Sequence, residues 1–97
     1  MIRHNVMFTW KDDATDAQRK RVAEELSKLP GLVPSIRAYR MGADIGVNEG
    51  NFDFAVSADF DDVAGYVAYR DDPTHRSIIA EHITPIVATR AAIQFQC

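Results

Sequence analysis

The chain has 97 residues, a formal net charge of −3 and 46% hydrophobic residues, values typical of one soluble globular domain. The acidic balance argues against nucleic-acid binding, which needs a basic surface, and the single cysteine, Cys97, excludes an internal disulfide. No apolar run reaches membrane-spanning length, and residues 1–5 lack the pattern of a signal peptide. We therefore expect a cytoplasmic protein without membrane contact, with a single domain over residues 1–97.

The first half of the chain predicts a strand, a helix and a second strand. Alternating apolar residues predict a strand over 2–10. Residues 15–18 (Thr-Asp-Ala-Gln) form a capping box, and apolar residues follow at helical spacing until Pro30-Gly31 ends the helix. A second strand is expected over 35–41, before a loop that contains three glycines.

The second half predicts a strand, a broken helix and a final strand. Strict alternation over 52–60 predicts the third strand. Asp61 or Asp62 then caps a helix, and a further helix opens at Pro73 and stops before Pro85. Residues 88–97 close the chain as a strand.

This element order, β-α-β-β-α-β, predicts a ferredoxin-like α+β fold with a four-stranded antiparallel sheet covered by helices on one face. The other face would stay partly apolar and open to water in a monomer. We expect that face to carry Met7, Tyr39, Met41, Ala55 and Ala92. A second copy stacked sheet to sheet would cover it, so a homodimer is expected.

Residues 66–75 break the second helix and place a phenol and an imidazole on either side of the break. Asp72 followed by Pro73 is typical of a helix N-cap and a first helical position, so the helix that carries Tyr69 should end just before them. His75 then lies in the first turn of the next helix, where the positive helix end disfavours imidazolium. A neutral imidazole near a tyrosine hydroxyl can act as a general base. The alternative interpretation is an ordinary surface histidine on a short connecting helix.

The remaining histidines and tyrosines allow structural interpretations as well. His4 shares the parity of the apolar residues of its strand, so it is either a satisfied core residue or a polar group on a cavity wall. Tyr66 is one helical turn from Tyr69, a spacing that packing explains, and it is a pocket residue if a cavity exists. His82 receives no role. The three histidines show no paired metal-ligand spacing, so neither a zinc site nor another cofactor is expected.

Taken in order, several segments resemble the stress-responsive α/β-barrel (Dabb) family, whose members form dimeric ferredoxin-like barrels. The resemblance extends along nearly the whole chain. It rests on residues 1–4 (MIRH), 29–37 (LPGLVPSIR), 42–46 (GADIG), 49–53 (EGNFD) with Asp59-Phe60, and Tyr69 with 73–75 (PTH). It implies the fold more directly than a function, because most members of this family have no assigned reaction.

The best understood proteins of that family are plant polyketide cyclases, which close a linear poly-β-ketone by aldol condensation. The resemblance places their catalytic tyrosine and histidine on Tyr69 and His75, and a further histidine of the first strand on His4. This chain departs from the cyclases at two of their histidines. It has Asp72 where they have a histidine before the proline, and Phe54 where they have another histidine.

Two further points of the resemblance concern the pocket wall and a metal. Ala23 and Leu26 stand near the positions where the cyclases set aromatic pocket walls. Some family members hold a magnesium ion on backbone carbonyls, which correspond here to Pro30, Val33 and Ile36; the side chains in this segment indicate no metal.

Three functional interpretations follow. The first is a small dimeric protein that binds a small organic molecule between sheet and helices, with no specific activity assigned. The second is a cyclase-like enzyme, in which His75 abstracts a proton α to a carbonyl and Tyr69 hydrogen-bonds the developing enolate oxygen. The third is a haem-degrading or quinol-forming monooxygenase of the same superfamily, with His75 as an axial ligand.

Overall fold

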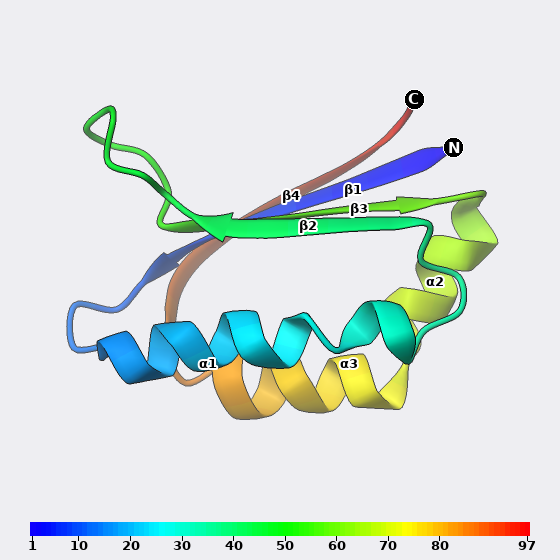
Figure 1. Cartoon of the computed structure of the whole chain (residues 1–97). Coiled ribbons are helices and arrows are strands. Elements are labelled where there is room, and N and C mark those ends of the chain that lie inside the picture. The colour runs from blue at the N-terminus through cyan, green and yellow to red at the C-terminus, as the bar shows by residue number, and fades with distance from the viewer.

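The computed structural model describes residues 1–97 as a four-stranded sheet with helices on one side (Figure 1). The strands are β1 (Ile2–Trp10), β2 (Ala38–Ala43), β3 (Phe54–Phe60) and β4 (Val87–Gln96). The helices are α1 (Asp16–Leu26), α2 (Val63–Asp71) and α3 (Pro73–Ile78), with a 3₁₀ turn η1 (Leu29–Gly31) and a π-helical turn η2 (Ile79–Ile83). The predicted ferredoxin-like α+β fold is confirmed. No helix combines the length and the apolar character that crossing a membrane requires.

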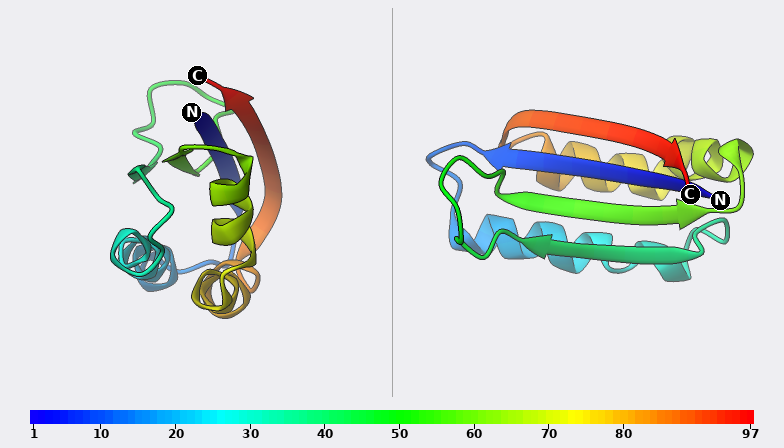
Figure 2. Two further views of the ribbon diagram at one scale, coloured as in Figure 1. Left: turned by 90° about the vertical axis from the view of Figure 1, so that its right-hand side faces the viewer. Right: turned by 90° about the horizontal axis from the view of Figure 1, so that it is seen from above.

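The sheet is antiparallel throughout, in the order β2-β3-β1-β4. Figure 2 shows this order from above and places the two chain ends side by side, where the Cys97 amide donates to the Met1 carbonyl at 2.9 Å. The sheet of one protomer is not closed into a barrel, so β2 and β4 are open edges. The second strand begins later than predicted, because a turn closed by the Ile36 amide on the Val33 carbonyl occupies its first residues.

Local sequence signals set the first helix, and its apolar side packs under the sheet. The capping box is formed in both directions, with the Gln18 amide donating to Thr15 Oγ1 at 3.1 Å and the Thr15 amide donating to Gln18 Oε1 at 2.9 Å. Val22, Leu26 and Leu29 are buried against the inner face of the sheet. Each such aliphatic side chain contributes about 2 kcal/mol of burial free energy.

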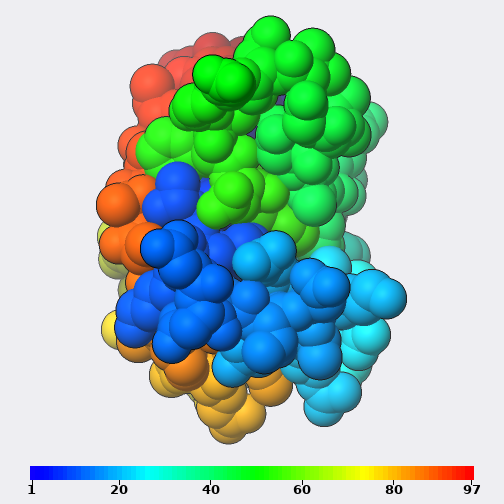
Figure 3. Space-filling view, turned by 90° about the vertical axis from the view of Figure 1, so that its left-hand side faces the viewer, coloured from blue at the N-terminus to red at the C-terminus, as the bar shows by residue number.

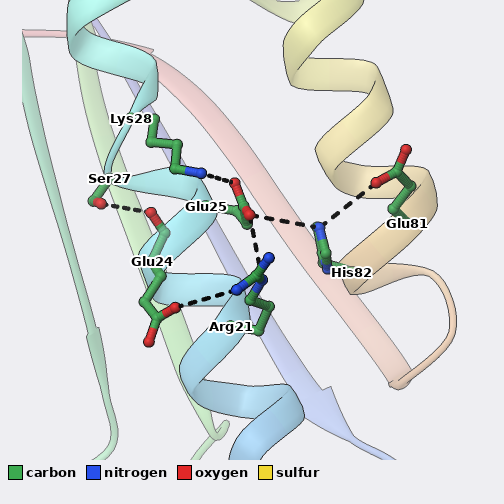
Figure 4. Close-up of polar contacts among 7 residues, drawn as sticks. All are labelled: Arg21, Glu24, Glu25, Ser27, Lys28, Glu81 and His82. Carbon is green, nitrogen blue, oxygen red and sulfur yellow. Dashed lines mark hydrogen bonds and ion pairs between the residues drawn. The ribbon is translucent and has the colours of Figure 1, made fainter.

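A cluster of charged side chains joins α1 to η2 along the outside of the helix layer (Figure 4). The Glu25 carboxylate receives Lys28 Nζ at 2.7 Å and Arg21 Nε at 3.3 Å, and His82 Nε2 lies 4.0 Å away. The hydrogen bond from Lys28 is the main reason that the pKa of Glu25 lies below its usual value. His82 therefore belongs to this helix–helix contact.

The break between α2 and α3 has the predicted form. Asp72 is the N-cap of α3, with its Oδ1 accepting the His75 amide at 3.0 Å, and Pro73 occupies the first turn. The Asp72 amide donates back to the Tyr69 carbonyl at 3.2 Å and closes the end of α2. One residue thus terminates one helix and starts the next.

The outer face of the sheet carries a different set of residues from the one predicted. The strand register pairs Tyr39 with Ala58 and Met41 with Val56, so both face the helices and pack against the core. Ala92 pairs with Val6 and also faces inward. The prediction was wrong for these three residues and right for Met7 and Ala55.

The apolar character of the outer face comes mainly from β4. Side chains alternate along this strand. The apolar set, which includes Ile93 and Phe95, faces outward, and the polar set, which includes Arg90 and Gln94, faces the helix side. Ile93 is 60% exposed in the isolated protomer. An outward apolar row on a sheet edge indicates that this face is covered by another surface.

The loop from 44 to 53 between β2 and β3 adds to this surface. It stands on the outer side of the sheet, above the start of α1 in the end view (Figures 1 and 3). Its tip exposes Ile45 and Val47 at 87% and 71%. Gly46, within the tip, and Gly50, after it, have φ values of +79° and +81°, which permit tight turns at these two positions.

We predict that Asp72→Ala lowers the free energy of unfolding by about 1 kcal/mol, because the α3 N-cap is lost. Asp72→Asn should retain most of that stability, since asparagine caps about as well as aspartate. Urea denaturation of the three proteins tests this; equal losses in both variants would show that the cap hydrogen bond is not the cause.

We also predict that the protein is a homodimer at micromolar concentration, through the outer faces of the two sheets. Ile93→Asp should give monomers, because it buries a charge at that interface. Leu32→Asp is the matched control: Leu32 is 55% exposed but lies beside η1 on the helix side. Light scattering that gives a monomer mass for the unaltered protein would contradict the prediction.

Candidate functional site

A cavity of about 320 Å³ lies between the inner face of the sheet and the helices. Its apolar part includes the buried side chains of Phe8, Leu26, Val56 and Ile83. Its polar lining comprises His4, Tyr66, Tyr69, Arg70, His75, Arg76, Thr84 and Arg90. Four of these polar residues are exposed: Arg70 of α2, Arg76 of α3, Thr84 after η2 and Arg90 of β4. The cavity therefore opens beneath the β4 edge.

His75 is fixed at this cavity by the helix break. It is only 8% exposed, so the interpretation of an ordinary surface histidine was wrong. Its Nδ1 lies 3.4 Å from the Arg70 carbonyl, which can only accept, so the proton belongs on Nδ1 and Nε2 is left as a free acceptor. Every buried side-chain nitrogen or oxygen has a partner, whereas Nε2 has none, so Nε2 must be accessible. Burial lowers the pKa of His75 below its usual value and keeps the ring neutral.

Tyr69 packs against His75 face to face rather than through a hydrogen bond. The two ring centroids are 4.0 Å apart, with a 31° angle between the planes. The Tyr69 hydroxyl instead pairs with the Tyr39 hydroxyl at 3.0 Å. Burial raises the pKa of Tyr69 well above its usual range, so this phenol stays protonated. It can donate a hydrogen bond but cannot act as a base at ordinary pH.

His4 is the second imidazole of the cavity and has the opposite proton arrangement. Its Nδ1 lies 2.8 Å from the side-chain nitrogen of Gln94, which donates. The remaining proton therefore sits on Nε2, which has no partner in the protein. Burial, assisted by the charge of Arg90, lowers the pKa of His4 to about 4. The ring of Tyr66 lies 5.0 Å from that of His4, centroid to centroid.

The structure thus brings His4, Tyr66, Tyr69 and His75 to one cavity, although they come from β1, α2 and α3. Tyr39, Gln94 and the three arginines were not predicted as part of this site. A signal for two of them was present in the sequence, because Arg90 and Gln94 share one parity of a strand whose other parity is apolar. Such a strand normally turns its polar side to water, and only the tertiary structure shows the reversal.

The positions where this chain departs from the resembled cyclases lie in different surroundings. Leu26 lines the cavity, whereas Phe54 packs on Trp10, with centroids 5.9 Å apart. Around η1 the Val33 carbonyl accepts the Ile36 amide at 3.2 Å, and residues 29–37 contain no carboxylate. The chain has no cluster of three or more His, Cys, Asp or Glu side chains that could hold a metal ion.

Comparison with known proteins extends this picture. A dimeric ferredoxin-like protein of unknown function from Thermobifida fusca YX is 46% identical, with a TM-score of 0.92 over 99% of this chain and 90% of that one. A Dabb-family protein with a ferredoxin-like fold from Mesorhizobium loti MAFF303099 is 25% identical, with a TM-score of 0.82 over 99% and 95%. The dimeric state of the Thermobifida protein supports a homodimer here.

A more distant structure has the same fold and a named activity. The hydroxynitrile lyase from Passiflora edulis is 18% identical, with a TM-score of 0.83 over 97% of this chain and 90% of that one. No curated protein matches the chain. The family model described as "Stress responsive A/B Barrel Domain" matches residues 2–97. The chain therefore belongs to the stress-responsive α/β-barrel (Dabb) family.

Proposed function

We propose that this protein binds a small, largely apolar organic molecule in the cavity and that His75 acts as a general base toward it. The observation that supports this proposal most strongly is the state of the His75 ring, which is neutral, has its Nδ1 on the Arg70 carbonyl, and leaves Nε2 free and accessible. A cavity of about 320 Å³ is at the lower end of the range for ligand pockets, so the ligand is small.

The proton to be removed is an acidic C–H α to a carbonyl. It moves to His75 Nε2, and the electron pair of the broken C–H bond passes to the carbonyl oxygen as an enolate. The cavity offers hydrogen-bond donors for that oxygen in the Tyr69 hydroxyl and the Nε2–H of His4. A positioned donor of this kind typically lowers a barrier by about 3 kcal/mol. If the ligand carries a second carbonyl within reach, the enolate can close a ring by aldol addition.

Tyr39 supports this role of Tyr69. When the Tyr39 hydroxyl donates to the Tyr69 oxygen, the Tyr69 proton is free for the ligand. The hydroxynitrile lyase has the same fold and is an enzyme, which supports catalysis over binding alone. The haem-degrading or quinol-forming alternative gains no support beyond the presence of His75, and the cavity is small.

We predict that the protein accelerates deuterium exchange at C2 of 1-phenylbutane-1,3-dione in D₂O, measured by proton NMR above the buffer rate. His75→Gln should lower the protein-dependent rate by about a hundred-fold or more, because a general base contributes about that much. Tyr69→Phe should also slow exchange, through loss of the enolate donor. His82→Gln is the matched control, because His82 lies in the contact with Glu25 outside the cavity.

Circular dichroism and thermal unfolding establish that each variant is folded before its rate is compared. An unchanged rate in folded His75→Gln would remove the catalytic assignment. Tight binding of the dione with no acceleration in the unaltered protein would leave a binding protein, the first of the sequence-based interpretations.

We further predict the pH dependence of this rate. Only neutral imidazole accepts a proton, and the pKa of His75 is lowered from its ordinary value near 6.5. The rate constant should therefore be level between about pH 7 and 8 and fall on the acid side, with its midpoint below about 6.5. Exchange rates from pH 5 to 8, corrected for buffer, test this. A midpoint above 7 would contradict a buried neutral base.

A further inference from the structure

The charged side chains that line the cavity are all cationic. Arg70, Arg76 and Arg90 line it, and no aspartate or glutamate does, in a chain whose net charge is −3. A cavity with cationic groups at its opening and apolar walls attracts anions and repels cations. This asymmetry indicates that the ligand is an anion.

Two of these arginines lack a partner within the protein. Arg70 pairs with Asp71 at 2.9 Å, as most other arginines of the chain pair with a carboxylate. Arg76 and Arg90 make no ion pair and no side-chain hydrogen bond. Arg40 is also unpaired but faces the outer side of the sheet, in register with Ser57. The two free guanidinium groups on the helix side thus converge on one cavity.

We propose that Arg76 and Arg90 bind the carboxylate of the ligand, so that the protein takes an organic acid with an apolar or aromatic body. Arg76 comes from α3 and Arg90 from β4, and both line the cavity. Guanidinium groups match carboxylates in geometry and can bind them through two hydrogen bonds. The apolar body would rest on Phe8, Leu26 and Val56.

The fields of both arginines reach the two histidines. Arg90 contributes to the lowered pKa of His4, and Arg76 contributes to that of His75. A bound carboxylate offsets these charges, whereas a bound cation would add to them. In a bound ligand of this kind the acid group would lie at the exposed arginines and the reacting carbon at His75.

This inference rests on the proposed function only in using the same cavity, and binding alone tests it. The probes are 2-naphthoate and its neutral isostere 2-naphthamide, measured by titration calorimetry at pH 7.5 and low salt. The unaltered protein should bind naphthoate at least ten-fold more tightly than naphthamide. Raising the salt to 0.5 M should weaken naphthoate binding and leave naphthamide binding unchanged.

Arg76→Gln and Arg90→Gln should each reduce the preference for the acid several-fold, and the double variant should remove it. Lys20→Gln is the matched control, since Lys20 is an exposed cation of α1 that does not line the cavity. It should keep the full preference. Naphthamide binding should survive in every variant, which shows that the cavity is intact.

Equal affinity for the two probes in the unaltered protein, failure of both to bind, or a full preference in the double variant would each overturn the inference. The proposed function is tested by the exchange rate and this inference by equilibrium binding of non-reacting probes. Failure of the exchange assay therefore leaves the binding result standing, and loss of the acid preference leaves the exchange result standing.

Discussion

The site depends on one hydrogen bond, that of the His75 amide to the Asp72 carboxylate. Asp72 ends α2, caps α3, and with Pro73 redirects the chain at the position where an uninterrupted helix would carry His75 elsewhere. The turn brings the imidazole against the Tyr69 ring and sets its Nδ1 on the Arg70 carbonyl. With Nδ1 engaged by the backbone, Nε2 is the ring nitrogen that remains for a ligand. A side-chain cap of one short helix thereby sets both the position and the tautomer of the candidate base.

The reversed β4 strand links the cavity to the outer face of the sheet. A strand alternates its side chains between two faces, so turning Arg90 and Gln94 toward the helix side necessarily turns Ile93 and Phe95 outward. Gln94 fixes His4 through its Nδ1, and Arg90 stands at the cavity opening. The polar wall of the cavity and the apolar face that needs a cover are two consequences of one register. A shift by one residue would lose both at once.

The two imidazoles differ in what they can do, although burial is the largest cause of a lowered pKa for each. His4 accepts from an amide and so presents a proton, whereas His75 donates to a carbonyl and so presents a lone pair. The His4 N–H donor, the free lone pair of His75 and the Tyr69 ring that contacts both imidazoles form a set suited to removing a proton from carbon and stabilising the resulting enolate. The fold provides this set without a metal cluster of its own side chains.

The sequence by itself determined the element order, the α1 capping box and the break at Asp72-Pro73, because these depend on neighbours a few residues apart. It also indicated His4, Tyr66, Tyr69 and His75 as candidate site residues. Only the tertiary structure decided that the Tyr69 hydroxyl is hydrogen-bonded to that of Tyr39 and that Tyr39 and Met41 face inward. It also decided that Arg76 and Arg90 line one cavity. These facts depend on strand register and on helix placement across the sheet. Alternation shows that two parities differ, but which parity faces the helices is fixed by pairing with other strands, and a local pattern does not contain that information.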